Sequence, residues 1–188
     1  MSEIKLFGKW DQSNIEINDL GLKSVITVTP TLAPHTCGRH EHKRFGKTKL
    51  NIIERLANRV MRPGQNGGKK VLALNAVAST LEIVHLKTGE NPVQVFVRAI
   101  ENSAPREEVT RISYGGVSYP QSVDASPQRR VDLALRFITD AARNSSFSSN
   151  KPFEECLADE IALAAAKDSK SYSVQKREEI ERIAISAR

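Results

Sequence analysis

Three of the chain's four histidines lie close together near its N-terminal end, with a cysteine among them. Imidazole and thiolate groups bind zinc well, so His35, Cys37, His40 and His42 are candidate metal ligands. Zinc sites usually take two ligands from each of two separated segments, because four side chains must close a tetrahedron. Four ligands within eight residues leave the backbone little room for this. We therefore expect no metal and no cofactor, and interpret this segment as a cationic, imidazole-rich arm that contacts RNA.

The glycine-rich segment GQNGGKK, from Gly64 to Lys70, partly matches a phosphate-binding loop. Its spacing is one residue short, Lys70 stands where Ser or Thr would hold magnesium, and a predicted helix precedes it where a strand is required. An NTPase is therefore not expected. Glycines still let backbone amides and lysines approach a phosphate closely, so Lys69 and Lys70 are expected to contact a nucleic-acid backbone. The alternative is a plain solvated turn.

No catalytic residue is expected, and the chain is not expected to be an enzyme. Ser, Cys, His and Asp are present, but no nucleophile elbow or similar local signature surrounds them. His85 falls on a predicted helix and is expected at the edge of the core. Three pairs of acids lie on or beside predicted helices. They are expected on solvent-exposed helix faces or at helix starts, not in a catalytic site: Glu107-Glu108, Glu154-Glu155 and Asp159-Glu160.

The positive charge is concentrated in residues 35–70, which carry ten Lys or Arg against two acids, a net charge of +8. The segments before and after each carry −1, and the whole chain carries +6 with a pI near 9.4. Such a patch repels itself unless a polyanion neutralises it, which indicates nucleic acid as the partner. A membrane is the weaker choice, because no apolar run approaches the length of a spanning helix and no signal peptide is evident. Two distant cysteines fit a reducing compartment, so a cytoplasmic location is expected.

Six helices are predicted from apolar residues that recur with helical spacing. The first covers Ile53 to Met61, and Arg55, Arg59 and Arg62 are expected to share an exposed cationic face. Asn91-Pro92 and Ser126-Pro127 are typical helix starts, with a capping side chain followed by proline. The other helices are expected at residues 71–87, 92–102, 126–142, 152–167 and 173–188.

A single β-hairpin is predicted where the apolar period changes from 3.6 to 2. Gly115-Gly116 forms the turn, and Tyr114 is then expected to pair with Val117 and Ile112 with Tyr119. An isolated two-stranded ribbon is only marginally stable in water. Its exposed aromatic and arginine content favours a ribbon that projects and contacts RNA.

The predicted fold is therefore mainly α: a six-helix bundle with one protruding β-hairpin arm and an extended basic N-terminal arm. Residues 1–48 are expected to form an N-terminal extension and basic arm, with one short strand near Ser24 to Thr29. Residues 49–188 are expected to form a helical domain with the hairpin at about 109–123.

Long blocks of the sequence resemble ribosomal protein seven of the small subunit (the S-seven family), in its archaeal and eukaryotic branch. The matching blocks include FGKW at 7–10, PHTCGRHEHKRF at 34–45, IERLANRVMRPGQNGGKK at 53–70, TGENPVQVFVRAIENSAPREEVTRI at 88–112 and VDASPQRRVDLALRFI at 123–138. Cys37, His40 and His42 depart from the residues that the family more often has at those positions.

The resemblance implies a primary rRNA-binding protein that binds the 3′ major domain and nucleates assembly of the subunit head. It also implies a hairpin that reaches toward the exit-site tRNA and the mRNA exit channel, and a neighbouring small-subunit protein, S-eleven. The rRNA contacts that it implies are Arg39, Lys43, Arg44, Lys47, Arg62, Lys69, Lys70, Arg106, Arg111, Arg129 and Arg130. The tRNA- and mRNA-proximal residues that it implies are Tyr114, Gly115, Gly116 and Val117.

A structural rRNA-binding protein has two alternatives, a helical DNA-binding regulator and a nuclease or RNA-modifying enzyme. A helical DNA-binding regulator would place one exposed helix face in a major groove and would dimerise, whereas the cations here spread over arm, loop and hairpin. A nuclease or RNA-modifying enzyme needs a carboxylate cluster or a metal, and the sequence offers no such site.

Overall fold

The computed structural model describes residues 4–39 and 42–188. Six α-helices and a two-stranded antiparallel hairpin confirm the predicted mainly α fold. A short 3₁₀ helix, η1 (Gly46–Lys49), comes first in the chain. It is followed by α1 (Ile52–Val60), α2 (Lys70–Thr88), α3 (Pro92–Ser103), β1 (Glu107–Tyr114), β2 (Val117–Asp124), α4 (Pro127–Ser146), α5 (Phe153–Ala165) and α6 (Tyr172–Ser186).

Helix α5 is the centre of the helical body, because it packs against α2, α3 and α4. Its Leu157 and Ile161 are fully buried, as are Phe96 and Ile100 of α3. These apolar stripes are the ones that the helical spacing predicts. Side-chain caps start several helices: the Asn91 side chain accepts a hydrogen bond from Val93 N at 3.1 Å, as its position before Pro92 predicts.

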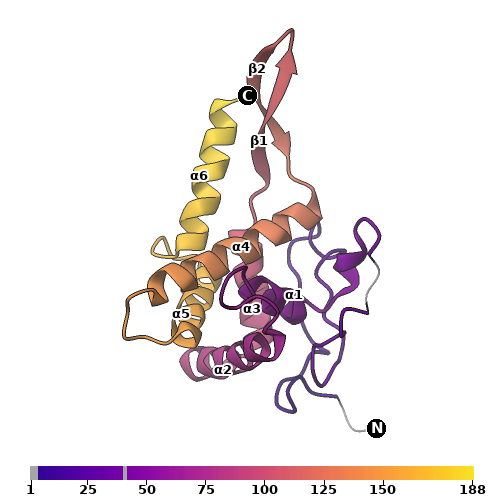
Figure 1. The fold of residues 1–188 in the computed structure, drawn as a ribbon, viewed down its shortest axis with the longest axis vertical. Coiled ribbons are helices and arrows are strands. Elements are labelled where there is room, and N and C mark those ends of the chain that lie inside the picture. Colours follow the sequence, from indigo (N-terminus) through magenta and orange to yellow (C-terminus); the bar gives the residue numbers. More distant parts are fainter. Residues whose placement is uncertain (1–3, 40–41) are drawn as a thin grey trace.

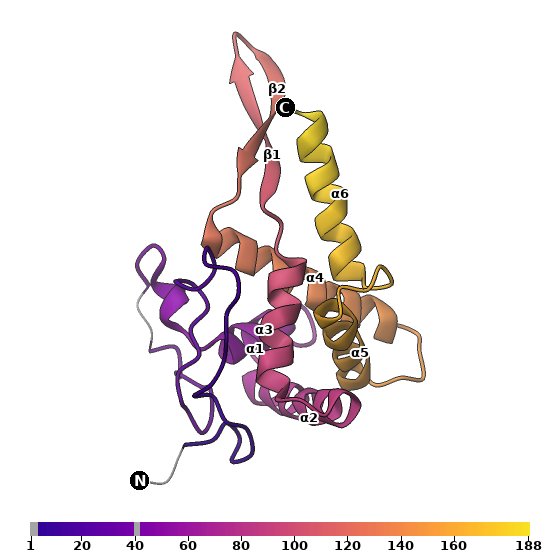
Figure 2. The same ribbon diagram turned by 180° about the vertical axis from the view of Figure 1, so that it is seen from behind.

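The hairpin has the predicted register, with Tyr114 opposite Val117 and Ile112 opposite Tyr119. Both turn glycines have positive φ, 58° at Gly115 and 83° at Gly116, as a two-residue hairpin turn requires. The hairpin projects from the helical body, and α6 runs alongside its lower half (Figures 1 and 2). The backbone N–H of Ser122 donates to the carbonyl oxygen of Ala187 at 3.3 Å.

The N-terminal segment, defined here as residues 4–34, is irregular but packs closely onto the helices. Its Leu6, Leu22, Val25 and Ile26 are buried in the main core. The expected short strand is reduced to one parallel bridge between Thr27 and Asn51. This segment therefore contributes to the core, which the sequence did not predict because its apolar residues follow no regular period.

The predicted basic arm is not uniformly extended. Its described residues form turns and then η1, which the periodicity of the sequence did not indicate. Thr36 holds the segment against the body, because its backbone N–H and its hydroxyl both donate to the buried carboxylate of Glu54, at 3.0 and 2.8 Å. The side chains at the turns, such as Arg39 and Arg44, are exposed.

Candidate nucleic-acid interface

A cationic groove follows one side of α4, and we call it the α4 groove. It consists of two hollows, of about 540 and 340 Å³, that share Arg59. The opposite wall comes from Phe45, from the end of α1 and from the loop Pro63 to Asn66. Five arginines line the two hollows: Arg59, Arg62, Arg129, Arg136 and Arg143.

The sequence of α4 places three of these arginines in line. Arg129, Arg136 and Arg143 are seven residues apart, which is about two helical turns, so they fall on one helix face. The seven-residue spacing is visible in the sequence, although Arg136 and Arg143 were not among the predicted RNA contacts. A row of cations on one helix face can contact several phosphates of a nucleic-acid backbone.

Acids of the chain neutralise part of this charge. Asp140 binds Arg62 through one carboxylate oxygen, and its other oxygen lies 3.6 Å from Nε of Arg136. Arg59 and Arg143 have no carboxylate partner within the part of the chain that the structure describes. The groove therefore keeps a positive excess that is open to an anionic partner.

Aromatic rings stand beside the cations at the two ends of the groove. Phe45 is half exposed, with a left-handed backbone (φ 66°), and the guanidinium of Arg44 lies 5.0 Å from its ring centre. Phe147 lies at the other end and is largely exposed. Exposed aromatic rings next to arginines are typical of surfaces that stack nucleic-acid bases. Neither phenylalanine was among the predicted site residues.

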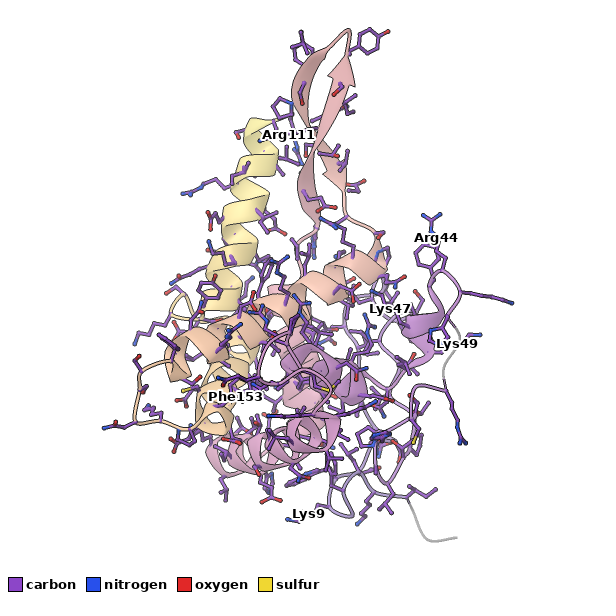
Figure 3. All side chains as sticks on the ribbon, viewed as in Figure 1. Lys9, Arg44, Lys47, Lys49, Arg111 and Phe153 are labelled. Carbon is purple, nitrogen blue, oxygen red and sulfur yellow. The ribbon has the colours of Figure 1, made fainter. Side chains whose placement is uncertain are left out.

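Two predicted site residues of the basic arm, Arg44 and Lys47, lie on the side of the N-terminal end of α4 (Figure 3). Arg39, Lys43 and Arg44 are exposed. Lys47 pairs with Asp132, which also receives a 3.1 Å hydrogen bond from Arg55. Arg55 itself is buried. The prediction that it shares an exposed cationic face with Arg59 and Arg62 is therefore wrong.

The two lysines that end the glycine-rich loop lie in different environments. Lys69 is exposed, whereas the ammonium group of Lys70 binds the buried carboxylate of Glu54. Burial alone would raise the pKa of Glu54, but hydrogen bonds from Lys70 and Thr36 outweigh it and lower the pKa below its ordinary value. Lys70 thus stabilises the fold, and only Lys69 presents its full charge to a partner.

The arginines at the start of α4 are also paired within the chain. Arg129 Nε donates to Glu108 of β1 at 2.7 Å, and Arg130 is buried between Asp19, at 2.7 Å, and the carbonyl oxygen of Pro105. Burial by itself raises the pKa of Asp19, but hydrogen bonds from Arg130 and Gly21 lower it overall. Cations at the N-terminal end of a helix are repelled by the helix dipole. For Arg129 and Arg130 this repulsion is offset by their ion pairs with Glu108 and Asp19.

The hairpin carries the remaining predicted residues. Arg106 is exposed at its base, and Figure 3 shows Arg111 on the ribbon near the end of α6. All four residues of the predicted tRNA- and mRNA-proximal tip are exposed. They are not part of the α4 groove, so the structure offers two separate candidate contact surfaces.

Of the four histidine and cysteine candidates, His40 lies outside the described residues. The ring nitrogen Nδ1 of His35 accepts a hydrogen bond from the backbone N–H of Cys37 at 2.9 Å. Among residues 4–39 and 42–188, no group of three His, Cys, Asp or Glu side chains is arranged to hold a metal ion. His85 lies partly buried against Trp10, and its Nδ1 is 2.8 Å from the carbonyl oxygen of Glu90.

A helical body with a projecting hairpin and a cationic groove defines a class of nucleic-acid-binding protein, and comparison with known proteins identifies the family. A family model described as Ribosomal protein S7p/S5e matches residues 22–188. The chain belongs to this family, whose members are structural constituents of the ribosome.

Three similar proteins, each named Small ribosomal subunit protein uS7, come from archaea. The one from Methanococcus maripaludis is 54% identical over 187 residues, covering 99% of this chain and 100% of the relative. The one from Methanosphaera stadtmanae is 52% identical over 97% of this chain and 98% of its own length. The one from Methanothermobacter thermautotrophicus is 51% identical, also over 97% and 98%. The predicted resemblance is thus confirmed over nearly the whole chain.

No helix in the described part of the chain is both long enough and apolar enough to cross a membrane.

Proposed function

We propose that this chain binds the 3′ major domain of small-subunit rRNA in cytoplasmic ribosomes and nucleates assembly of the subunit head. The observation that carries the proposal is the α4 groove, in which five arginines and two exposed phenylalanines line adjacent hollows. Arginine forks bind phosphate oxygens, and aromatic faces stack on bases, so the groove suits folded RNA with accessible bases.

The proposed mechanism is neutralisation of phosphates and fit to RNA shape. Each cation that binds a phosphate releases a condensed counter-ion, which makes affinity fall as salt concentration rises. Arg39, Arg44 and Lys69 extend the cationic surface beyond the groove, onto the basic arm and the glycine-rich loop. Their spread over several elements supports contact with a large, shaped RNA surface.

The hairpin supports a second role, near the exit-site tRNA and the mRNA. It projects away from the helical body, so its tip can reach a partner that does not contact the α4 groove (Figure 1). Tyr114 and Val117 at the tip are exposed and lie beside two glycines, whose small size permits close approach. We also propose S-eleven as a neighbouring small-subunit protein.

Binding of a transcribed 3′ major domain fragment, in competition with duplex DNA of equal length at matched salt, tests this function. We expect the RNA fragment to bind at least about a thousandfold more tightly, the lower end of the usual ratio of specific to non-specific binding. Equal affinity for the two nucleic acids would favour a general polyanion binder and contradict the proposal. Preference for one DNA sequence would favour a DNA-binding regulator.

A further inference from the structure

The larger hollow of the α4 groove has the properties of a pocket and not only of a charged surface. It encloses about 540 Å³ between the C-terminal half of α4, the loop that follows α1 and the start of α5. Figure 3 labels Phe153 on the α5 side. A volume of this order accommodates a small organic ligand such as one nucleotide.

Two arginines of the pocket have guanidinium groups that no carboxylate of the described chain neutralises. Nε of Arg59 is buried without a hydrogen-bond partner among the described residues, so Arg59 can contact a ligand only through the outer part of its guanidinium group. Arg59 and Arg143, on opposite walls, have no carboxylate partner in the described chain, so both guanidinium groups can face an anion.

Phe147 forms one rim of the pocket, and its side chain is 81% exposed. The backbone places it there: its N–H donates to the carbonyl oxygen of Arg143 at 3.0 Å, which ends α4. The next residue, Ser148, then turns the chain with a positive φ of 56°. The backbone of Phe147 is thus fixed at an ordered helix end, four residues after Arg143, and its ring is largely open to solvent.

These features suit an unpaired base better than a paired one. In a duplex, the neighbouring base pairs cover the faces of each base, so an aromatic ring cannot stack on them. A bulged or looped nucleotide exposes its base for stacking, and its phosphate can bind the two arginines.

We propose that this pocket takes one extruded nucleotide of the bound RNA, with its base against Phe147 and its phosphate between Arg59 and Arg143. The inference rests on the proposed RNA-binding function and adds to it a preference for an unpaired nucleotide at a defined place on the protein.

The test uses the full chain and two short RNA stem-loops, one with a single bulged 2-aminopurine and one fully paired. We expect the wild-type protein to bind the bulged stem at least about fivefold more tightly, the lower end of the contribution of one stacked base. The fluorescence of 2-aminopurine should fall on binding, because stacking quenches it. Phe147→Ala and Phe147→Leu should both remove the preference, since leucine is apolar but has no aromatic face.

A matched control distinguishes a pocket from a general effect of exposed apolar side chains. Leu86, near the end of α2, is 83% exposed and lies outside both proposed contact surfaces, so Leu86→Ala should keep the preference and the quenching. Arg143→Ala should weaken binding of the bulged stem more than Arg182→Ala, which removes an exposed arginine of α6. Unchanged thermal melting of each variant would show that the fold is intact.

Equal wild-type affinity for the two stems, or a preference that survives in Phe147→Ala, would overturn the inference. If the protein still bound the 3′ major domain fragment in preference to duplex DNA, only the nucleotide pocket would be rejected. Loss of that preference as well would reject the proposed function itself.

Discussion

At the scale of single residues, six cations of this chain illustrate two different roles. Lys70, Arg55 and Arg130 each bind a carboxylate that lies far away in the sequence or is itself buried. A buried charge without a partner is costly, so these residues are needed by the fold. Lys69, Arg59 and Arg143 have no such partner within the described chain, and they are available to RNA.

The adjacent residues Lys69 and Lys70 should therefore respond differently to the same substitution. Lys69→Ala should leave stability unchanged and lower the salt slope of rRNA binding by about one unit, because one phosphate contact is lost. Lys70→Ala should lower the free energy of unfolding by about 3 kcal/mol, because Glu54 is left buried without its cation. Urea denaturation and salt-dependent fluorescence anisotropy measure the two effects. Equal stability of the two variants would contradict the conclusion that Lys70, but not Lys69, stabilises the fold.

Glu54 should also make the stability of the protein depend on pH. Its pKa is lower in the folded chain than its ordinary value of 4.5, so the ionised form contributes stability above that value. This contribution is lost as the pH falls through the lowered folded pKa. We expect the unfolding free energy to decrease below pH 4.5 in the wild type and to decrease less in Glu54→Gln. If the unfolding free energy had the same pH dependence in the wild type and in Glu54→Gln, Glu54 would not contribute to the pH dependence of stability.

At the scale of elements, the hairpin depends on α6. Two strands alone are marginally stable in water. Here the last residues of the chain support the ribbon: the carbonyl oxygen of Ala187 accepts a hydrogen bond from Ser122 N, and Arg188 pairs with Glu107. The C-terminal end thus keeps the lower half of the hairpin in a fixed direction.

Removal of Ala187 and Arg188 should loosen the hairpin without unfolding the helices. We expect faster amide hydrogen exchange at Ser122 and its neighbours in β2, while the buried amides of α3 and α5 keep their protection. Arg188→Ala, which removes only the ion pair, should have a smaller effect, because that pair is exposed. Unchanged exchange at Ser122 in the truncated protein would show that the hairpin supports itself.

At the scale of the whole molecule, the N-terminal segment completes the core. Leu22 is fully buried, and Asp19 from the same segment pairs with Arg130 of α4. The Asn91 side chain, which caps α3, also donates to the carbonyl oxygen of Asp11 at 2.8 Å. The segment therefore connects the start of α3 with α4, on the side of the molecule opposite α6 in Figure 2.

Two nearby leucines test this role. Leu22→Ala should lower the free energy of unfolding by about 2–5 kcal/mol, because a fully buried side chain is removed. Leu20→Ala should change it by less than about 0.5 kcal/mol, because that side chain is 83% exposed. Chemical denaturation measures both. Similar values for the two variants would show that the segment does not contribute to the core.

The parts that the sequence predicted well depend on local patterns. The register of the hairpin follows from Gly115-Gly116, and the start of α3 follows from Asn91-Pro92. The burial of Arg55 and Arg130 could not be predicted, because their partners Asp132 and Asp19 lie 77 and 111 residues away. The contribution of Leu22 to the core was missed for a similar reason, since an irregular segment has no period that marks its buried side.

The α4 groove was only partly predictable. Arg129 came from the family resemblance, and the seven-residue spacing to Arg136 and Arg143 was visible in the sequence. The hollow itself depends on how the loop after α1 packs beside α4, which no local pattern encodes.

Sedimentation of the tagged protein from cells that express it tests most directly whether the α4 groove places this chain on small-subunit rRNA. We expect the wild type and the control variant Arg98→Ala/Arg182→Ala to sediment with the small subunit. The groove variant Arg59→Ala/Arg143→Ala should fold normally but shift toward the unbound fractions at the top of the gradient. A folded groove variant that sediments with the small subunit as completely as the wild type would contradict the account.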